Sequence, residues 1–241
     1  MQLKNTLAFL FGLTLLVSCS SAPEHTEPLK RAVPEEVTAF FGEDITYGKG
    51  HHTSTGEPKG TYLEVAVHDE KLGQQYGDLS LPASNCAYLS YKNLPATERQ
   101  QYDYFKITMQ DGSTPHSYTF PRLELAQAAQ AATDLDVLMT SFKDRNYPAV
   151  VNTFSASAIT PEIRAQLPAN LATIEQKIGP VQQYYLEGYA PTQVLLAGKK
   201  LRLIRLFVTL SHPKKASRML VVIDPELQSK DKFLYGLNIL N

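Results

Sequence analysis

The sequence predicts an α+β protein made of two small domains, and three patterns support this fold class. Residues 61–68 alternate apolar and polar side chains, which is typical of a half-buried strand. Residues 161–178 repeat apolar side chains at helical spacing until Gly179. From residue 181 onward, segments rich in β-branched and aromatic residues alternate with turn residues. Helices and antiparallel strands that occupy separate stretches indicate an α+β arrangement.

Length and composition limit the classes of protein that remain. The chain has 241 residues, enough for one large domain or two modest ones. Hydrophobic residues make up 43% and charged residues 20%, which argues against wholesale disorder, a collagen and a polytopic membrane protein. The formal net charge of -1 lacks the basic excess of a nucleic-acid-binding protein, so we expect no nucleic-acid partner.

The first 18 residues have the order of a secretory signal peptide. Lys4 precedes an apolar run over residues 7–17, and small residues follow. The run is shorter than the roughly 20 residues with which a helix crosses a bilayer. We therefore expect residues 1–18 to be removed rather than to fold.

Residues 16–19 (LVSC) end this segment and resemble the lipobox of bacterial lipoproteins. The resemblance implies cleavage before Cys19 and acylation of that cysteine, which would anchor the chain permanently in a membrane. An ordinary signal peptide that happens to contain a cysteine is the alternative. In enterobacterial lipoproteins an Asp after the cysteine resembles an inner-membrane retention signal, and here Ser20 and Ser21 follow instead. The expected location is the outer membrane, facing either the periplasm or the cell exterior.

Residues 19–33 are polar and contain prolines, which predicts a tether between the anchor and the folded chain. Residues 34–132 are assigned to an N-terminal α+β domain. Pro34 with the two acids after it predicts the start of a helix, and Gly42 its end. The expected elements are a helix over 35–41, a turn-rich stretch over 47–60, strands over 61–68, 102–109 and 116–120, and helices over 80–94 and 122–132.

Cys86 has no disulfide partner once Cys19 is acylated, because the chain has only 2 cysteines. Its neighbours Ala83, Ala87 and Leu89 suggest a helix face. We expect a small buried side chain there, and a reactive or intermolecular thiol is the minority interpretation.

The predicted boundary between the domains lies near Thr133, so that residues 133–241 form the second domain. Thr133 and Asp136 have the spacing of a capping box, which predicts a helix that starts there. Another helix start is predicted at Thr160, where a proline and an acid follow. The expected elements are helices over 133–142, 148–154 and 161–178, and strands over 181–186, 192–196, 201–210, 218–223 and 233–240.

Five short segments of the second domain resemble the NTF2-like (cystatin-like) superfamily, and in particular its DUF3887-like secreted bacterial domains. They are residues 142–147 (FKDRNY), 151–155 (VNTFS), 160–162 (TPE), 178–180 (IGP) and 235–239 (YGLNI). The resemblance covers residues 133–241 and implies helices packed on a curved antiparallel sheet around a conical cavity. Enzymes of the superfamily place an Asp, Tyr or His in that cavity as acid or base.

The cavity implied by this resemblance directs attention to Arg205, Tyr185 and Asp224, which we assign to anion binding and to acid or base chemistry. Arg205 is either a pocket cation for an anionic ligand or the ion-pair partner of an acid such as Glu187. The strand over 201–210 is apolar on both faces, so both faces must be covered. The domain's own helices provide one cover. The other is the first domain, a partner, or a second copy, which would make a homodimer through the sheet.

Positive charge is concentrated between Glu187 and Asp224, where the sequence has no acid. The predicted basic edge comprises Lys199, Lys200, Lys214, Lys215 and Arg218. One interpretation is contact with the phosphates of lipid headgroups or lipopolysaccharide, or with anionic glycans. The other is a lysine-protected edge strand that resists aggregation.

No catalytic, metal or cofactor motif emerges from the sequence. His51 and His52 lie in a Gly-rich stretch with no further ligand at the spacing of a metal site, and no phosphate-binding or nucleophile motif occurs. The 13 tyrosines favour a surface that stacks on sugar rings, a protein interface, or a half-buried core. The leading hypothesis is a non-catalytic binding or interaction module without a cofactor, whose partner is an envelope protein, glycan or lipid. The alternative is a small-ligand receptor or an enzyme that uses the NTF2-like cavity.

Overall fold

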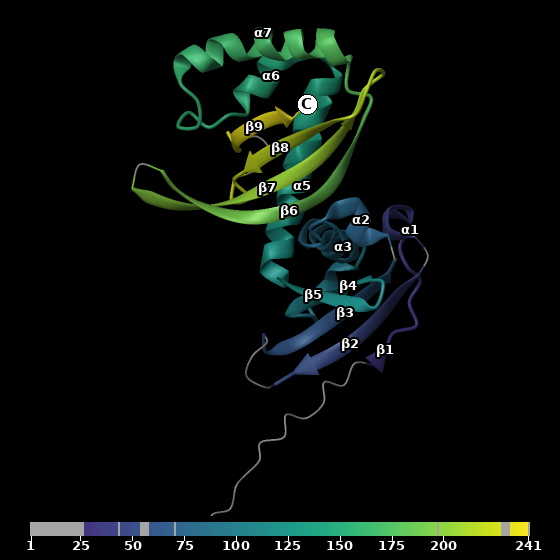
Figure 1. Ribbon diagram of the computed structural model, residues 1–241. Coiled ribbons are helices and arrows are strands. Elements are labelled where there is room, and N and C mark those ends of the chain that lie inside the picture. Colours follow the sequence, from purple (N-terminus) through teal and green to yellow (C-terminus); the bar gives the residue numbers. More distant parts are fainter. Residues whose placement is uncertain are drawn as a thin grey trace, which may run out of the picture.

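The computed structural model describes residues 27–42, 44–53, 58–69, 71–196, 198–227 and 232–240, which form two sheets and seven helices (Figure 1). The N-terminal sheet has five strands and the C-terminal sheet has four. The predicted α+β class is therefore confirmed. In chain order the elements are β1 (Glu27–Pro28), α1 (Glu35–Phe41), β2 (Ile45–His52), β3 (Gly60–His68), α2 (Leu72–Tyr76), α3 (Ser80–Lys92), α4 (Ala96–Arg99), β4 (Tyr104–Asp111), β5 (Thr114–Pro121), α5 (Arg122–Lys143), α6 (Tyr147–Asn152), α7 (Pro161–Ile178), β6 (Gln183–Leu196), β7 (Lys199–Ser211), β8 (Ser217–Ile223) and β9 (Leu234–Leu240).

The N-terminal sheet has the strand order β1-β2-β3-β4-β5, in which β3 and β4 are parallel and the other neighbours are antiparallel. A parallel pair needs a crossover connection, and the segment with α2, α3 and α4 provides it. Leu63, Val65 and Val67 alternate along β3 and are fully buried. The strand predicted over residues 61–68 is confirmed.

The turn-rich stretch predicted over residues 47–60 is wrong for its first half, because residues 45–52 form strand β2. One of the glycines that suggested turns, Gly50, makes room for a neighbouring aromatic ring instead. Gly50 pairs with Tyr62, and a Cβ at Gly50 would lie 2.2 Å from atoms of that ring. His51 and His52 are therefore the last residues of a strand rather than part of a loop.

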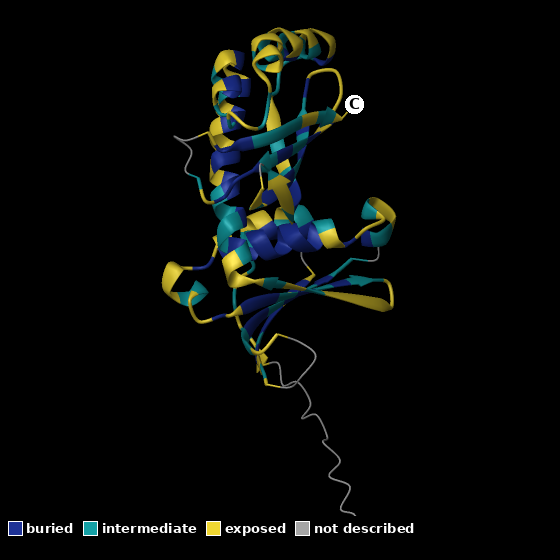
Figure 2. Cartoon of the chain, turned by 90° about the vertical axis from the view of Figure 1, so that its left-hand side faces the viewer, coloured by how far each residue is buried: buried dark blue, intermediate teal, exposed yellow. Residues whose placement is uncertain are grey.

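Helix α3 lies between the two sheets and contacts both β4 and β6 (Figures 1 and 2). It is buried on most of its sides, and small residues at its surface allow close approach of the strands. A Cβ at Gly188 of β6 would lie only 2.3 Å from the carbonyl oxygen of Leu81. Cys86 is fully buried in α3, as predicted, and burial raises the pKa of its thiol to about 12, so the thiol is chemically inert in the folded chain.

Helix α5 runs without interruption through the predicted boundary near Thr133. The predicted helix start at that residue is wrong: its hydroxyl donates to the carbonyl oxygen of Ala129, 3.1 Å away, in the middle of α5. One end of α5 packs against α3 and β5, and the other against α6, β7 and β8 (Figure 1). Buried residues from both sheets form one contiguous core. The division of the chain at residues 132 and 133 stays a prediction.

The C-terminal sheet is an antiparallel meander in the order β6-β7-β8-β9. The two short strands predicted over 181–186 and 192–196 are one long strand, β6, which absorbs an irregularity between Leu186 and Gly188 as a bulge. Pro191 is tolerated because β6 is an edge strand. Helices α6 and α7 have the side-chain caps Asn146 and Thr160.

The predicted tether over residues 19–33 is wrong for its described part, because residues 27–33 lie on the N-terminal unit. Strand β1 pairs with β2, and Leu29 and Val33 pack against the core. Arg31 forms an ion pair with Glu98 at 2.5 Å. Cys19 and the signal segment lie outside the described residues. Among the helices that the structure describes, none is long and apolar enough to cross a membrane.

Candidate functional site

A groove of about 530 Å³ lies where α1, α3, α5 and β6 meet. We call it the junction groove. Its aromatic wall residues are Phe40, Tyr88, Tyr184 and Tyr185, and its polar ones are Glu36, Asn85, Lys92 and Asp136. Ligand sites have this composition: concave, mostly apolar or aromatic, with a few polar groups.

Helical spacing places much of the groove on one face of α3. Tyr88 and Leu89 are three and four residues after Asn85, and Lys92 is four and three residues after them, so all four lie on one face of the helix. Glu36 and Phe40 have the same relation on α1. Helices α1 and α3 and the edge strand β6 of the C-terminal sheet thus contribute to one surface.

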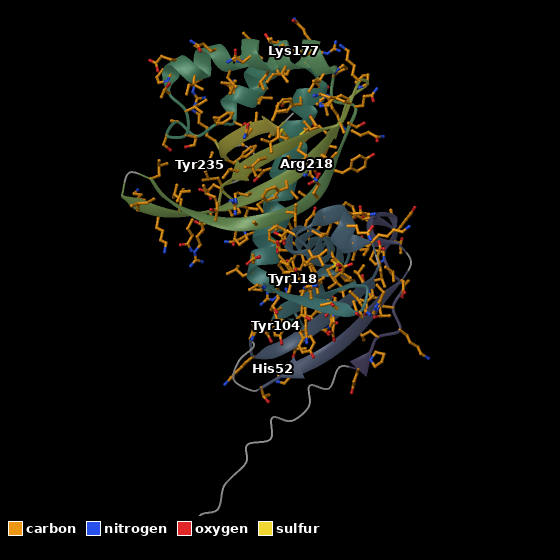
Figure 3. The ribbon with its side chains drawn as sticks, in the orientation of Figure 1. His52, Tyr104, Tyr118, Lys177, Arg218 and Tyr235 are labelled. Carbon is orange, nitrogen blue, oxygen red and sulfur yellow. The ribbon has the colours of Figure 1, made fainter. Side chains whose placement is uncertain are left out.

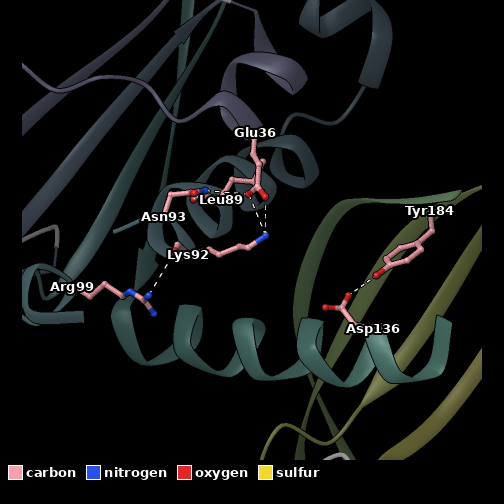
Figure 4. A network of polar contacts seen from close by, with 7 residues as sticks. All are labelled: Glu36, Leu89, Lys92, Asn93, Arg99, Asp136 and Tyr184. Atoms are coloured by element: carbon pink, nitrogen blue, oxygen red, sulfur yellow. Dashed lines mark hydrogen bonds and ion pairs between the residues drawn. The ribbon is translucent and has the colours of Figure 1, made fainter. Parts of the chain in front are cut away.

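Polar contacts fix the two walls of the groove separately (Figure 4). The Lys92 ammonium donates to both carboxylate oxygens of Glu36 at 3.1 and 3.2 Å, and Asn93 donates to one of them at 3.2 Å. On the opposite wall the Tyr184 hydroxyl donates to Asp136 at 2.5 Å. These contacts hold α1 on α3 and β6 on α5.

Asn85 is the unusual residue of the groove. It is 1% exposed, and neither its side-chain oxygen nor its side-chain nitrogen has a hydrogen-bond partner among the described residues. Its neighbour Ser84 is fully satisfied, since its hydroxyl donates to Leu81 and accepts from the backbone N–H of Tyr189. A buried amide without partners costs about 1–3 kcal/mol for each unpaired group. Such a cost is typical of sites that are completed by a ligand.

Both groove tyrosines that face carboxylates are held in the neutral form. Burial, followed by the nearby Asp136 and Glu36 carboxylates, raises the pKa of Tyr88 to about 12. Burial and the hydrogen bond to Asp136 also raise the pKa of Tyr184. Both phenols therefore remain hydrogen-bond donors throughout the physiological pH range.

We expect these tyrosines to make the fold sensitive to alkali. The pKa of Tyr189 is also raised, by burial and by the Glu124 carboxylate. Because the folded-state pKa values lie above the ordinary value of about 10, the neutral phenols of Tyr88, Tyr184 and Tyr189 stabilise the fold below pH ~10, and this contribution is lost as the pH rises through the folded values. The Tm should stay level to about pH 10 and fall steeply above it.

A parallel titration of phenolate absorbance checks the assignment. The Tyr88→Phe/Tyr184→Phe variant should lose part of the late-titrating amplitude. A single titration step near pH 10 for every tyrosine, with the fold intact, would contradict the prediction.

The interior between the C-terminal sheet and helices α5 to α7 is almost filled. The pocket found there has about 20 Å³ of space, room for roughly one water molecule, and its lining includes Phe142, Leu171 and Ile178. The His212 ring lies there, 2.9 Å from the Ser217 hydroxyl and 2.9 Å from the Gly179 carbonyl oxygen.

A serine and a histidine oriented by a third group have the form of a nucleophile and its base. Both residues are buried, and no space for a substrate adjoins them, so the contact instead ties the β7–β8 turn to the end of α7.

The three residues assigned to the implied cavity do not all come together, although Asp224 follows Ile223, which pairs with Ile204 next to Arg205. Tyr185 pairs with Thr209, four residues from Arg205 along β7, which is a separation of about 13 Å. Only Tyr185 lines the junction groove. Asp224 follows β8 and accepts a hydrogen bond from the backbone N–H of Glu226 at 3.0 Å.

The predicted ion pair of Arg205 with Glu187 is wrong. Glu187 accepts from Arg218 at 3.1 Å and from the Thr209 hydroxyl. The Arg205 guanidinium lies 6.0 Å from the centre of the Phe207 ring. Glu187 lies at the bulge of β6, and Arg205 pairs with Ala190, three residues further along that strand.

The predicted single basic edge is not formed. Lys199 and Lys200 lie at the β6–β7 turn, whereas Lys214 and Lys215 lie at the β7–β8 turn. Strand β7 has 13 residues, so the two turns are about 40 Å apart. Arg218 lies within β8 (Figure 3) and is paired with Glu187. The distance between the two lysine pairs is not apparent from the sequence, because successive turns of a meander lie at opposite ends of the sheet.

Sequence reasoning identified part of the groove. It assigned Tyr185 to a ligand site, but it missed Asn85 and gave Asp136 the role of a helix cap. The spacing of Asn85, Tyr88 and Lys92 on one helix face was the available signal.

Neither a metal-ligand cluster nor a similar protein suggests a function for this site. Within the described ranges no group of three His, Cys, Asp or Glu side chains could hold a metal ion. Comparison of the chain with protein-family models, curated proteins and solved structures finds no match.

Proposed function

We propose that the protein is an envelope lipoprotein, anchored in the outer membrane through Cys19, that binds a small ligand non-catalytically in the junction groove. The observation that carries the proposal is the buried amide of Asn85, which lines the junction groove and has no hydrogen-bond partner among the described residues. The C-terminal half is assigned to the NTF2-like superfamily, which three helix segments on an antiparallel meander support. Binding is placed outside the NTF2-like interior because that interior has almost no free volume.

The chemistry of the groove favours a sugar that carries an N-acetyl group. Tyr88, Tyr184 and Tyr185 offer ring faces for stacking on pyranose rings. The Asp136 carboxylate accepts hydrogen bonds from hydroxyl groups. The Asn85 amide provides one acceptor and one donor group, which complement the N–H and C=O of an acetamido group. A volume of about 530 Å³ accommodates a ligand of disaccharide size.

A binding role suits the groove better than glycoside hydrolysis. Hydrolysis needs a carboxylic acid whose pKa is raised, so that it can protonate the leaving group. Burial would raise the pKa of Glu36, but hydrogen bonds from Asn93 and Lys92 outweigh burial and hold that pKa below its usual value. Glu36 therefore stays an anion and acts as a structural tie between α1 and α3.

Calorimetric titration of the unacylated chain 20–241 tests this proposal. N,N'-diacetylchitobiose should bind at least tenfold more tightly than cellobiose, which has the same ring frame with hydroxyls in place of the acetamido groups, because a site built around an amide rejects an analogue without one. Tyr184→Ala should weaken binding about fivefold to tenfold through lost stacking.

The matched control is Tyr235→Ala, which removes a tyrosine of β9 that does not line the groove (Figure 3). Equal affinity for the two disaccharides, or an equal loss of affinity in both tyrosine variants, would contradict the junction groove as the binding site.

A further inference from the structure

The β6–β7 hairpin extends beyond the rest of the C-terminal sheet (Figure 1). Strand β8 pairs only with residues 204–210 of β7. Residues 199–203 and their partners 192–196 in β6 therefore form a two-stranded ribbon. We call its outer part, residues 194–196 and 199–202, the ribbon tip. A two-stranded ribbon is only marginally stable by itself, so a projecting ribbon of this length suggests that it contacts a partner.

The ribbon tip exposes apolar side chains beside cations. Leu195 is 76% exposed, the largest value among the large hydrophobic residues of the described ranges, and Val194 is 37% exposed. Cross-strand pairing puts Leu195 opposite Lys200 and Leu196 opposite Lys199. An isolated exposed leucine needs no explanation, but a cluster of apolar side chains rimmed by cations at a projecting end indicates an interaction surface.

The first turn of α5 continues this surface. Leu123 is 67% exposed, and it borders a hollow of about 320 Å³ together with Gln193 and Arg202 of the ribbon. Arg122 is exposed next to it. The acid facing this hollow is Glu124, whose pKa is raised by burial.

The charge of this surface contrasts with that of the chain. The sequence has no acid from residue 188 to residue 223, whereas the whole chain has a net charge of -1. Arg122, Lys199, Lys200 and Arg202 are exposed; Arg122 adjoins Leu123 in the chain, and Lys200 lies across the strand pair from Leu195. Exposed apolar side chains among cations match the boundary between acyl chains and anionic headgroups.

We propose that the ribbon tip and the first turn of α5 rest on the surface of an anionic lipid bilayer. Leu123, Val194 and Leu195 enter the headgroup region, while Lys199, Lys200 and Arg202 remain at the level of the lipid phosphates. Each such cation strengthens binding to an anionic surface roughly fivefold. The contact is weak by itself, but a chain held at the membrane by another anchor needs only a weak second contact to fix its orientation.

Flotation of the unacylated chain 20–241 with lipid vesicles tests the proposal. The protein should float with vesicles of phosphatidylcholine and phosphatidylglycerol at 3:1 but not with phosphatidylcholine alone, and added salt should release it. Leu195→Ser and Lys199→Gln/Lys200→Gln should each lower the partition coefficient at least fivefold. All of these side chains are exposed, so the variants should keep the Tm of the parent chain.

Lys214→Gln/Lys215→Gln is the matched control, because it removes the same charge at the other end of β7. It should leave the partition coefficient unchanged. An equal loss in both lysine pairs would show a general charge effect and overturn the proposal, as would equal flotation with neutral vesicles. The outcome is independent of sugar binding in the junction groove.

Discussion

Replacing Gly188 by alanine is expected to lower the free energy of unfolding by about 3 kcal/mol. The new methyl group would lie 2.3 Å from the Leu81 carbonyl oxygen and 2.6 Å from the Ser84 hydroxyl oxygen. The first of these is helix backbone, which cannot rotate away as a flexible side chain can. Helix α3 must therefore shift from β6, at a cost near the upper end of that for overpacked cores. For a chain of this length the Tm should fall by about 6–12 °C.

Gly198→Ala is the matched control for this substitution. Gly198 lies at the tip of the β6–β7 hairpin with a φ of 78°, and no atom lies within 4 Å of the position that its Cβ would take. That variant measures only the cost of a side chain in the left-handed region, about 1 kcal/mol. Urea unfolding of both variants provides the comparison. A loss at Gly188 no larger than the loss at Gly198 would show that α3 does not press against β6.

The same experiment tests whether the chain folds as two domains. The close contact at Gly188 joins the C-terminal sheet to helix α3, and the core is continuous across both sheets. We expect Gly188→Ala to lower one unfolding transition that both sheets share. If the parent chain instead unfolds in two steps and only one of them moves, the predicted division near residue 133 describes independent folding units.

Local sequence signals predicted the elements whose ends have their own chemistry. Thr160 caps α7 and Gly179 ends it, as the sequence indicated. The predictions that failed concern elements whose structure is determined by tertiary contacts. Gly48 and Gly50 are typical of turns, yet both lie in strand β2. At Gly50 a glycine is needed because the Tyr62 ring occupies the place of a Cβ. Thr133 and Asp136 have the spacing of a capping box, but Thr133 lies inside helix α5, which is long enough to pack against strands of both sheets.

The candidate site was less predictable than the fold because it is assembled from distant segments. Tyr184 comes from an edge strand and Asn85 from a helix of the other half of the chain. The carboxylate of Glu187, at the bulge of β6, contacts Arg218 and Thr209 rather than Arg205. A family resemblance also pointed toward an interior that large side chains fill here. Neither the bulge nor the filled interior is visible in residue spacing.

Asn85→Leu is expected to stabilise the chain while it abolishes sugar binding. In the parent chain both polar groups of this side chain are buried without partners in the described residues, so replacing them by carbon removes a desolvation cost. The free energy of unfolding should rise by about 1–2 kcal/mol, and the adjoining groove leaves room for the slightly different shape. The affinity for N,N'-diacetylchitobiose should fall at least tenfold, because leucine cannot pair with an acetamido group.

The adjacent Ser84→Ala should have the opposite effect on stability. The Ser84 hydroxyl accepts from the backbone N–H of Tyr189 at 2.8 Å, and its loss leaves a buried donor without a partner. We expect that variant to lose about 1–3 kcal/mol. Thermal unfolding with and without the disaccharide measures both effects in one assay. If Asn85→Leu were destabilising, Asn85 would be an ordinary packing residue, and the argument for a ligand at the junction groove would fail. Opposite signs at two neighbouring buried positions would instead show that one serves the fold and the other is kept at a cost to stability, as binding residues are.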